Sequence, residues 1–238
     1  MMGDLGRRFV AAVAWLGVVT GILTLVAVGG AASGVRVPAP DPVIQAPSAT
    51  PITVTLEAVA DAYVDNGMPN NNYGGAQQLF ASLYGEFNNL QQVLARFNLS
   101  SIPAGATVQS ATARFYQVSG SGLSSVTLNL GRAGASWTEY GVTFNNRPTQ
   151  YLVGSAAVGT GAGWKSWDAT SLVTSWLNGT HPNYGLGITG PVTGSLWLRQ
   201  FSSREGSAAP QLVVTYLAPT PTPTPTRTPT RTATPTRT

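Results

Sequence analysis

Between residues 53 and 217 the chain is a succession of short runs rich in β-branched and aromatic residues, separated by glycine and asparagine. Such runs predict strands. The clearest lie at residues 53–59, 79–84, 93–99, 107–118, 126–130, 186–189, 196–201 and 212–217. One helix is predicted at residues 169–177, with Asp168 as its N-cap and Gly179 as its stop. Many short strands at this spacing are typical of a sandwich or barrel, so the sequence predicts an all-β domain with one short helix.

Both flanks of this region are rich in proline. Residues 35–52 hold five prolines, and residues 218–238 consist of ten Thr, six Pro, three Arg and two Ala. Segments without an apolar face cannot bury enough surface to fold, so both are predicted to be disordered, the second being a tail or a linker to further domains. The single domain is assigned to residues 53–217. Because the chain has no cysteine, burial alone must stabilise that domain.

The first 34 residues have the layout of an export signal. Arg7 and Arg8 precede an uncharged run of 20 residues, 9–28, and small residues follow it. Because ~20 apolar residues also suffice to span a bilayer, a cleaved signal peptide and a retained signal anchor both remain open. Either one predicts that the remainder is secreted or held at the cell surface, with membrane contact only through a retained anchor.

The formal net charge of +4 lies at the ends of the chain. Residues 53–217 contain six Arg and one Lys against seven acidic residues, and are therefore neutral overall. A nucleic-acid-binding protein concentrates positive charge on its folded part, so the charge distribution excludes that class.

Few residues suit catalysis. The only histidine is His181, in the turn-like segment NGTHPNYG, which argues against a serine or cysteine triad. A pair of carboxylates, as in glycosidases, needs no histidine, but several acids have simpler roles. Asp168 suits a helix cap, Asp65 a turn, and Glu205 an ion pair with Arg204 or a bond from a backbone amide. The chain is therefore predicted not to be an enzyme, with a polysaccharide lyase or glycosidase as the less favoured alternative.

One segment offers hard oxygen ligands. Asp61, Asp65 and the asparagine-rich residues 66–72 have the ligand type that calcium prefers. Asparagine and aspartate also form Asx turns without any ion, and this interpretation is favoured. No cofactor is predicted, and a structural calcium ion is the alternative.

Strand alternation separates an apolar face from a polar one. Ala113 and Phe115 share one phase, whereas Arg114 and Tyr116 share the other; in SLWLRQF the tryptophan and arginine oppose the two leucines. Aromatic rings stack on sugars, and arginine pairs with uronate or sulfate groups. The candidate ligand-binding residues are Arg96, Arg114, Tyr116, Trp197 and Arg199 on this outward face, and Lys165, which with Trp164 borders it. The alternative is that the arginines form ion pairs within the domain.

Five stretches, in order, resemble the bacterial DNRLRE domain, also classed as carbohydrate-binding module family 96. They are ADAYVDNGMPNNNYG, VLARFNLSSIPAGATVQSATARFY, WTEYGVTFNNRP, WKSWDATSLVTSWLNG and FSSREGSAAPQLVVTY. The resemblance spans residues 54–216. It implies a single β-sandwich of jelly-roll type, found in extracellular multi-modular proteins, noncatalytic, with alginate binding in some members.

The combined prediction is a noncatalytic extracellular carbohydrate-binding module whose partner is a polysaccharide, in particular an acidic one such as alginate. Its expected role is to tether a larger protein or a cell to that polymer. The alternative is a structural spacer or adhesion domain of a cell-surface protein, without a sugar ligand.

Overall fold

The computed structural model describes residues 50–192 and 194–219. The predicted export segment 1–34, most of the linker 35–52 and nearly all of the tail 218–238 therefore lie outside the described residues. Within the described part, no helix is both long and apolar enough to cross a membrane.

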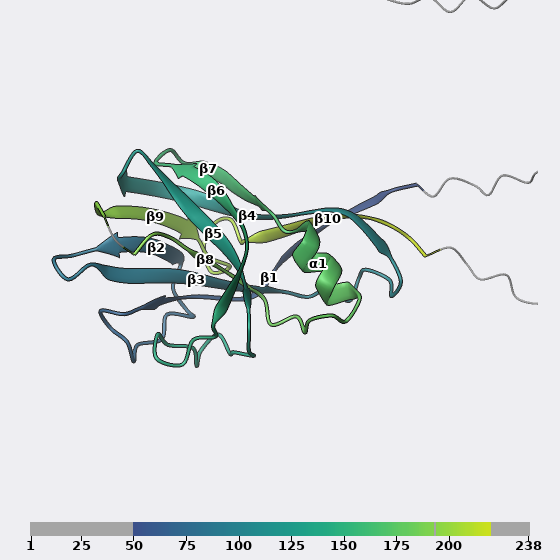
Figure 1. Cartoon of the computed structure of the whole chain (residues 1–238), viewed down its shortest axis with the longest axis horizontal. Coiled ribbons are helices and arrows are strands. Elements are labelled where there is room, and N and C mark those ends of the chain that lie inside the picture. Colours follow the sequence, from purple (N-terminus) through teal and green to yellow (C-terminus); the bar gives the residue numbers. More distant parts are fainter. Residues whose placement is uncertain (1–49, 193, 220–238) are drawn as a thin grey trace, which may run out of the picture. The chain divides into compact units, whose positions relative to one another are not determined.

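The described fold consists of ten strands and one helix (Figure 1). All paired strands run antiparallel. The elements are β1 (Ile52–Asp65), β2 (Gln78–Tyr84), β3 (Asn89–Phe97), β4 (Thr107–Gly122), β5 (Ser125–Ala133), β6 (Gln150–Gly159), β7 (Gly163–Asp168), α1 (Thr170–Leu177), β8 (Leu186–Thr189), β9 (Trp197–Ser202) and β10 (Gln211–Leu217).

Six of the strands close into a ring. The ring runs from β1 through β10, β4, β9, β2 and β3 back to β1. Strand β1 closes it by pairing with β10 through its first half and with β3 through its second half, on either side of an irregularity between Ala58 and Ala60. Strand β7 pairs with β4, and β8, β5 and β6 continue the sheet beyond β3. Because β1 closes the ring, neither β10 nor β3 presents an unpaired edge where it lies beside β1.

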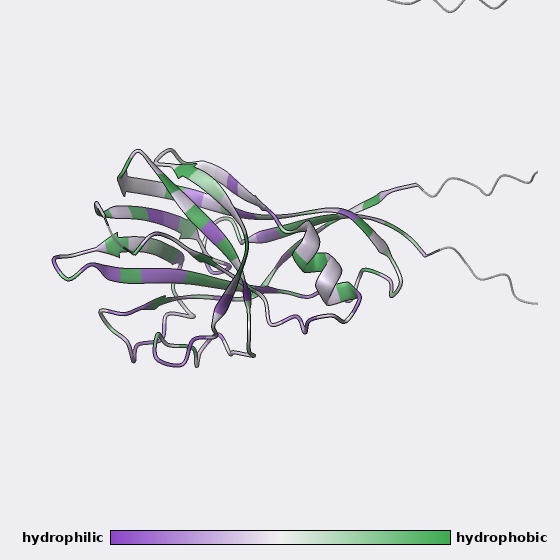
Figure 2. Ribbon diagram, viewed as in Figure 1, coloured by the Kyte–Doolittle hydropathy of each residue, from purple (hydrophilic) through white to green (hydrophobic). Residues whose placement is uncertain are grey.

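The main core lies on the apolar phase of these strands. Val93, Phe97, Phe115, Trp167 and Phe201 are among its buried members. Apolar and polar residues alternate along the ribbons in Figure 2, as expected for strands with one face toward a core.

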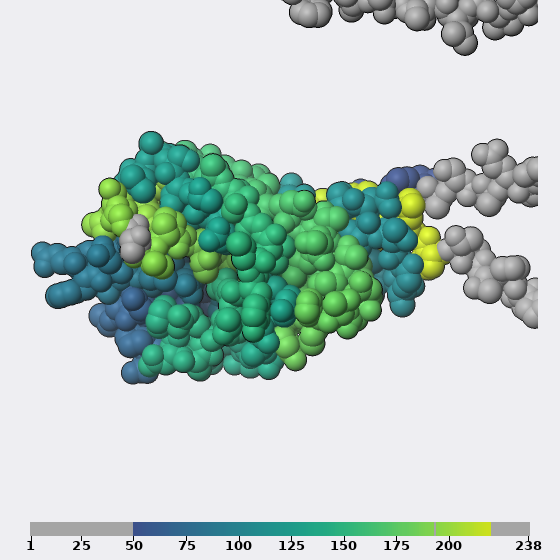
Figure 3. Space-filling model, in the orientation of Figure 1, coloured from purple at the N-terminus to yellow at the C-terminus, as the bar shows by residue number. Residues whose placement is uncertain are grey.

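A second, smaller core explains why the end of β1 is buried on both faces. Loop 134–149, between β5 and β6, covers β1 and β3 with Trp137 and Val142, which pack on Val64 and Leu94. The same loop lies against the loop after β1, as Figure 3 shows, and the Asn72 side-chain amide bonds the Val142 carbonyl at 2.7 Å. Loop 134–149 is thereby held as part of the fold.

The all-β prediction with one short helix is confirmed for the described residues. The jelly-roll form of the sandwich stays a prediction. Two strands, β6 and β7, were not predicted; β6 is rich in Gly, Ala and Ser, which are weak strand formers. The N-cap of α1 is Ala169 rather than Asp168.

Candidate functional site

The prediction that Trp197 and Arg199 face outward from β9 is wrong. Trp197 is 2 % exposed and Arg199 is fully buried, whereas Leu196 is 47 % exposed. Trp197 joins Phe201 in the main core because the ring turns this phase of β9 inward. Neither side chain can therefore meet a polysaccharide.

Arg199 instead fastens strands together. Its guanidinium donates five hydrogen bonds to four backbone carbonyls, those of Ser121, Leu123, Val158 and Leu198. Burial lowers the pKa of Arg199. The five donors of a guanidinium allow this one side chain to bond carbonyls of β4, β6, β9 and the turn between β4 and β5.

Two of the predicted residues do share an outward surface. Tyr116 and Trp164 pack edge to face with ring centroids 5.5 Å apart, and the Arg114 guanidinium lies 4.8 Å from the Trp164 ring centroid. Trp164 is 39 % exposed. Lys165 pairs in register with the core residue Phe115, so it lies on the same face of the sheet as Phe115 and not on the face of Tyr116 and Trp164, and its predicted place beside the outward surface is wrong.

Arg96 lies apart from that surface. It lines a cavity of about 420 Å³ with loop residues that include Trp137 and Asn146. Its Nη1 donates to the Trp137 carbonyl at 3.2 Å, and its guanidinium lies 5.6 Å from that indole ring centroid. The six predicted residues therefore do not form one site. Ligand binding by Arg96, Arg114, Tyr116 and Lys165 stays a prediction.

The alternative that the candidate arginines Arg96, Arg114 and Arg199 pair with the domain's own acids is wrong. Among residues 50–192 and 194–219, ion pairs join only Arg204, to Glu139 at 2.8 Å and to Glu205 at 3.8 Å. The other described arginines have no carboxylate partner there, so an external anion would not have to displace one.

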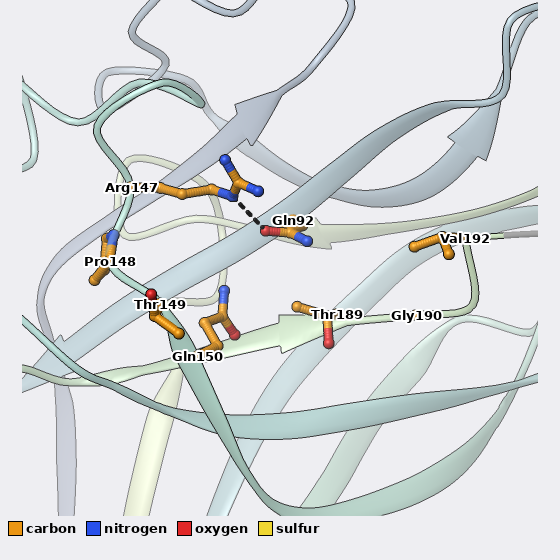
Figure 4. Close-up of a pocket in the computed structure, with 8 residues that line it drawn as sticks. All are labelled: Gln92, Arg147, Pro148, Thr149, Gln150, Thr189, Gly190 and Val192. Atoms are coloured by element: carbon orange, nitrogen blue, oxygen red, sulfur yellow. Dashed lines mark hydrogen bonds between the residues drawn. The ribbon is translucent and has the colours of Figure 1, made fainter.

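One of these arginines lines a polar cavity that the sequence did not indicate. The cavity measures about 410 Å³. It is lined by Gln92, Arg147, Pro148, Thr149, Gln150, Thr189, Gly190 and Val192 (Figure 4). These residues come from β3, the end of β8 and the segment after it, the start of β6 and the end of loop 134–149, so the loop closes one side of the cavity over the sheet.

Arg147 is held in place from two sides. Its guanidinium stacks 3.5 Å from the Phe144 ring centroid and donates to the Phe144 carbonyl and to Gln92 Oε1, the latter at 3.1 Å. Partial burial lowers the pKa of Arg147. Within the described residues Nη2 has no hydrogen-bond partner, which leaves a fixed pair of donors for a ligand.

Gln150 presents the strongest sign of a missing partner. Both Nε2 and Oε1 of its carboxamide are buried, and neither has a partner among the described residues. The amide lies against Gly131 and Gly187, where a Cβ atom would overlap it. A buried amide without hydrogen bonds costs about 1–3 kcal/mol, and a ligand that supplies one acceptor and one donor offsets that cost.

The catalytic candidates do not assemble. His181 lines a cavity with Ser175, but the Ser175 hydroxyl donates to the Leu172 carbonyl.

Asp65 accepts hydrogen bonds from the Gly67 amide and the Tyr84 hydroxyl, which confirms the Asx-turn interpretation for Asp65. Burial raises the pKa of Asp61 to about 7.

The sequence did not indicate Arg147 because it lies in a loop, to which strand alternation assigns no role. It did not indicate Gln92 and Gln150 because neither lies in a predicted strand. The cavity exists only because these segments, which are distant in sequence, meet in the folded domain. Residues 145–148 (NNRP) do lie within one of the stretches that carry the family resemblance. That resemblance was the only feature of the sequence that pointed to this loop.

Comparison with known protein families identifies the domain. The model of a family described as "Carbohydrate-binding module family 96" matches residues 52–216. No curated protein matches the chain.

Proposed function

The chain belongs to carbohydrate-binding module family 96, and on that premise we propose that its folded domain binds a polysaccharide at the Arg147 cavity without changing it chemically. The observation that carries this proposal is the Gln150 carboxamide, whose two polar atoms are buried beside Arg147 without partners. Sugar hydroxyls both donate and accept, so one sugar residue satisfies both atoms once the Gln150 side chain turns toward the open cavity.

The chemistry of the cavity favours an acidic sugar. Arg147 supplies a fixed positive charge with no carboxylate partner in the described fold, and a planar guanidinium suits a uronate carboxylate. Val192, which is 58 % exposed, adds apolar surface for a face of the sugar ring. A uronic-acid polymer such as alginate is therefore the proposed ligand.

A binding role without catalysis fits the placement of the acids. Asp61 and Glu139 are both buried, and neither lines any of the cavities described above. A glycosidase needs two carboxyls that flank a substrate bond, and these two do not border an open cavity.

The location of the domain is part of the proposal. We infer from residues 1–34 that the chain is exported, as a secreted or a surface-held protein. The proline-rich segments 35–52 and 218–238 then act as extended spacers that tether the module to a cell or to further domains.

Affinity electrophoresis of the full chain tests the proposal with alginate, pectin and neutral glucans in the gel. We expect retardation by a uronate polymer, and the Gln150→Ala variant should weaken it about tenfold, equivalent to about 1.4 kcal/mol. The matched control is Trp164→Ala, which alters the exposed surface of β7 and leaves the cavity intact.

Two outcomes contradict the proposal. Loss of binding in Trp164→Ala but not in Gln150→Ala places the ligand on the Arg114, Tyr116 and Trp164 surface. A folded chain that binds none of these polymers favours the structural spacer or adhesion domain.

A further inference from the structure

Three acidic side chains from separate segments meet beside the closed ring. Asp61 belongs to β1, Glu139 to loop 134–149 and Glu205 to the loop between β9 and β10. One carboxylate oxygen from each lies within 4.8 Å of the others. Oxygens bound to one calcium ion at ~2.4 Å lie no farther apart than about twice that distance, so the cluster meets this geometric condition.

The cluster carries more negative charge than its neighbours compensate. Arg204 is the only described basic residue that pairs with it, through Nη1 to Glu139 Oε2 at 2.8 Å and Nε to Glu205 Oε1 at 3.8 Å. Backbone amides add two bonds, from Arg204 to Asp61 Oδ2 and from Asp61 to Glu139 Oε1. One guanidinium against three carboxylates leaves an excess of two negative charges when all are ionised.

Two oxygens of the cluster have no partner. Asp61 is 1 % exposed, and its Oδ1 is buried with no hydrogen-bond partner in the described fold. Glu205 Oε2 is likewise buried without one. A buried carboxylate oxygen without a donor or a cation is strongly unfavourable, so both atoms point to a positively charged ligand.

We propose that Asp61, Glu139 and Glu205 bind a calcium ion. All three ligands are hard oxygens, and neither histidine nor cysteine is part of the cluster, which disfavours zinc and other transition metals. Magnesium demands a near-ideal octahedron and retains several waters, whereas calcium tolerates irregular sets of carboxylates that bind with one or both oxygens. The unpartnered oxygens of Asp61 and Glu205 are its first ligands.

The ion would join three parts of the fold that are distant in sequence. It links β1, loop 134–149 and the loop between β9 and β10 at one point. Because loop 134–149 also carries Arg147, calcium would stabilise the loop that closes the polar cavity.

Thermal unfolding and calorimetry of the full chain test the site. After dialysis against a chelator, addition of 1 mM calcium chloride should raise the Tm by several degrees, and 1 mM magnesium chloride should raise it by less than half as much. Titration calorimetry should show one calcium bound per chain.

Variants identify the ligands. Glu205→Gln, at a partly exposed position, should weaken calcium binding at least tenfold while the chain remains folded, and Asp61→Asn should do the same. Glu57→Gln and Glu86→Gln remove exposed acids elsewhere and should bind calcium like the parent chain. Three outcomes overturn the proposal: no Tm shift and no heat with calcium, a larger shift with magnesium, or unchanged calcium affinity in Glu205→Gln.

Discussion

At the scale of single residues, Arg199 shows that a charged side chain can belong to the core. Its five hydrogen bonds replace water for four carbonyls, so its contribution is to stability rather than to recognition. A methionine fills similar space but donates nothing. We therefore expect Arg199→Met to lower the free energy of unfolding by about 3 kcal/mol or more, since several buried carbonyls lose their donor.

Urea unfolding measures this loss, and Arg199→Lys is the graded control. Lysine keeps the charge but has three donors on one nitrogen, so it should recover only part of the difference. A loss below about 1 kcal/mol in the methionine variant would show that water reaches these carbonyls.

Gly187 offers a way to alter the polar cavity without removing a polar group. A Cβ atom at this position would overlap the Gln150 carboxamide, which is the flexible end of a side chain. Gly187→Ala should therefore displace the amide and weaken uronate binding about tenfold, while the free energy of unfolding changes by less than about 1 kcal/mol. Gly154→Ala, where the nearest atom lies at an ordinary 3.6 Å, should leave both quantities unchanged. Unchanged affinity in Gly187→Ala would argue against the cavity as the binding site.

At the scale of elements, the first turn of α1 is capped by Asp168, which lies one residue before the N-cap residue Ala169. Asp168 Oδ1 accepts from the Thr170 amide at 2.8 Å and from the Thr170 hydroxyl at 2.6 Å. Asp168→Ala should lower the free energy of unfolding by about 1 kcal/mol, and Asp168→Asn, which keeps the acceptor, by less.

The same contact predicts a pH dependence. The bonds from Thr170 lower the pKa of Asp168 below its ordinary value of 3.8. The folded state therefore favours the ionised carboxylate, so this contribution is complete above about pH 4 and is lost as the pH falls through the lowered pKa. Urea unfolding between pH 2 and pH 5 should show a smaller acid-induced loss in Asp168→Asn than in the parent chain. Equal losses would contradict the assignment.

Strands with a strong one-sided pattern could be predicted from the sequence, and others could not. The predicted boundaries of β8 match the structure, and Ala113 and Phe115 face the core as alternation requires. Alternation failed in β9 because it assumes that the arginine faces water, whereas ring closure buries that phase and supplies carbonyl acceptors. Edge-like β6 was missed because its small residues bury little apolar surface.

The candidate sites could be predicted less well than the fold. The sequence offered Asp61 as a calcium ligand only in the less favoured alternative, and its proposed partners Glu139 and Glu205 lie 78 and 144 positions away, beyond any local motif. Arg147 and Gln150 lie outside every predicted element. Both sites depend on how loop 134–149 folds over the sheet, which is a tertiary event that periodicity does not encode.

At the scale of the whole domain, ring closure makes the two ends of the fold depend on each other. Residues 52–57 of β1 pair with β10, from Ile52 opposite Tyr216 to Glu57 opposite Gln211, and both strands leave the ring at the same end (Figure 1). Val54 and Leu56 also pack on the main core. The start of β1 is therefore part of the closed ring, as the partner of β10.

Truncation tests this dependence. A chain that lacks residues 1–49 keeps every β1 pair and should unfold with the same Tm as the full chain. A chain that lacks residues 1–57 loses six paired residues and the packing of Val54 and Leu56, and leaves β10 as an unpaired edge. Full burial of two such aliphatic side chains contributes about 3–6 kcal/mol, so the partial burial of Val54 and Leu56 contributes a share of that, against the 5–15 kcal/mol that stabilises a typical domain. We expect the shorter chain to aggregate or to lose its cooperative transition in differential scanning calorimetry, because an exposed β10 edge invites intermolecular pairing. A cooperative transition within a few degrees of the full-length value would show that the remaining strands form a stable core without the closed ring.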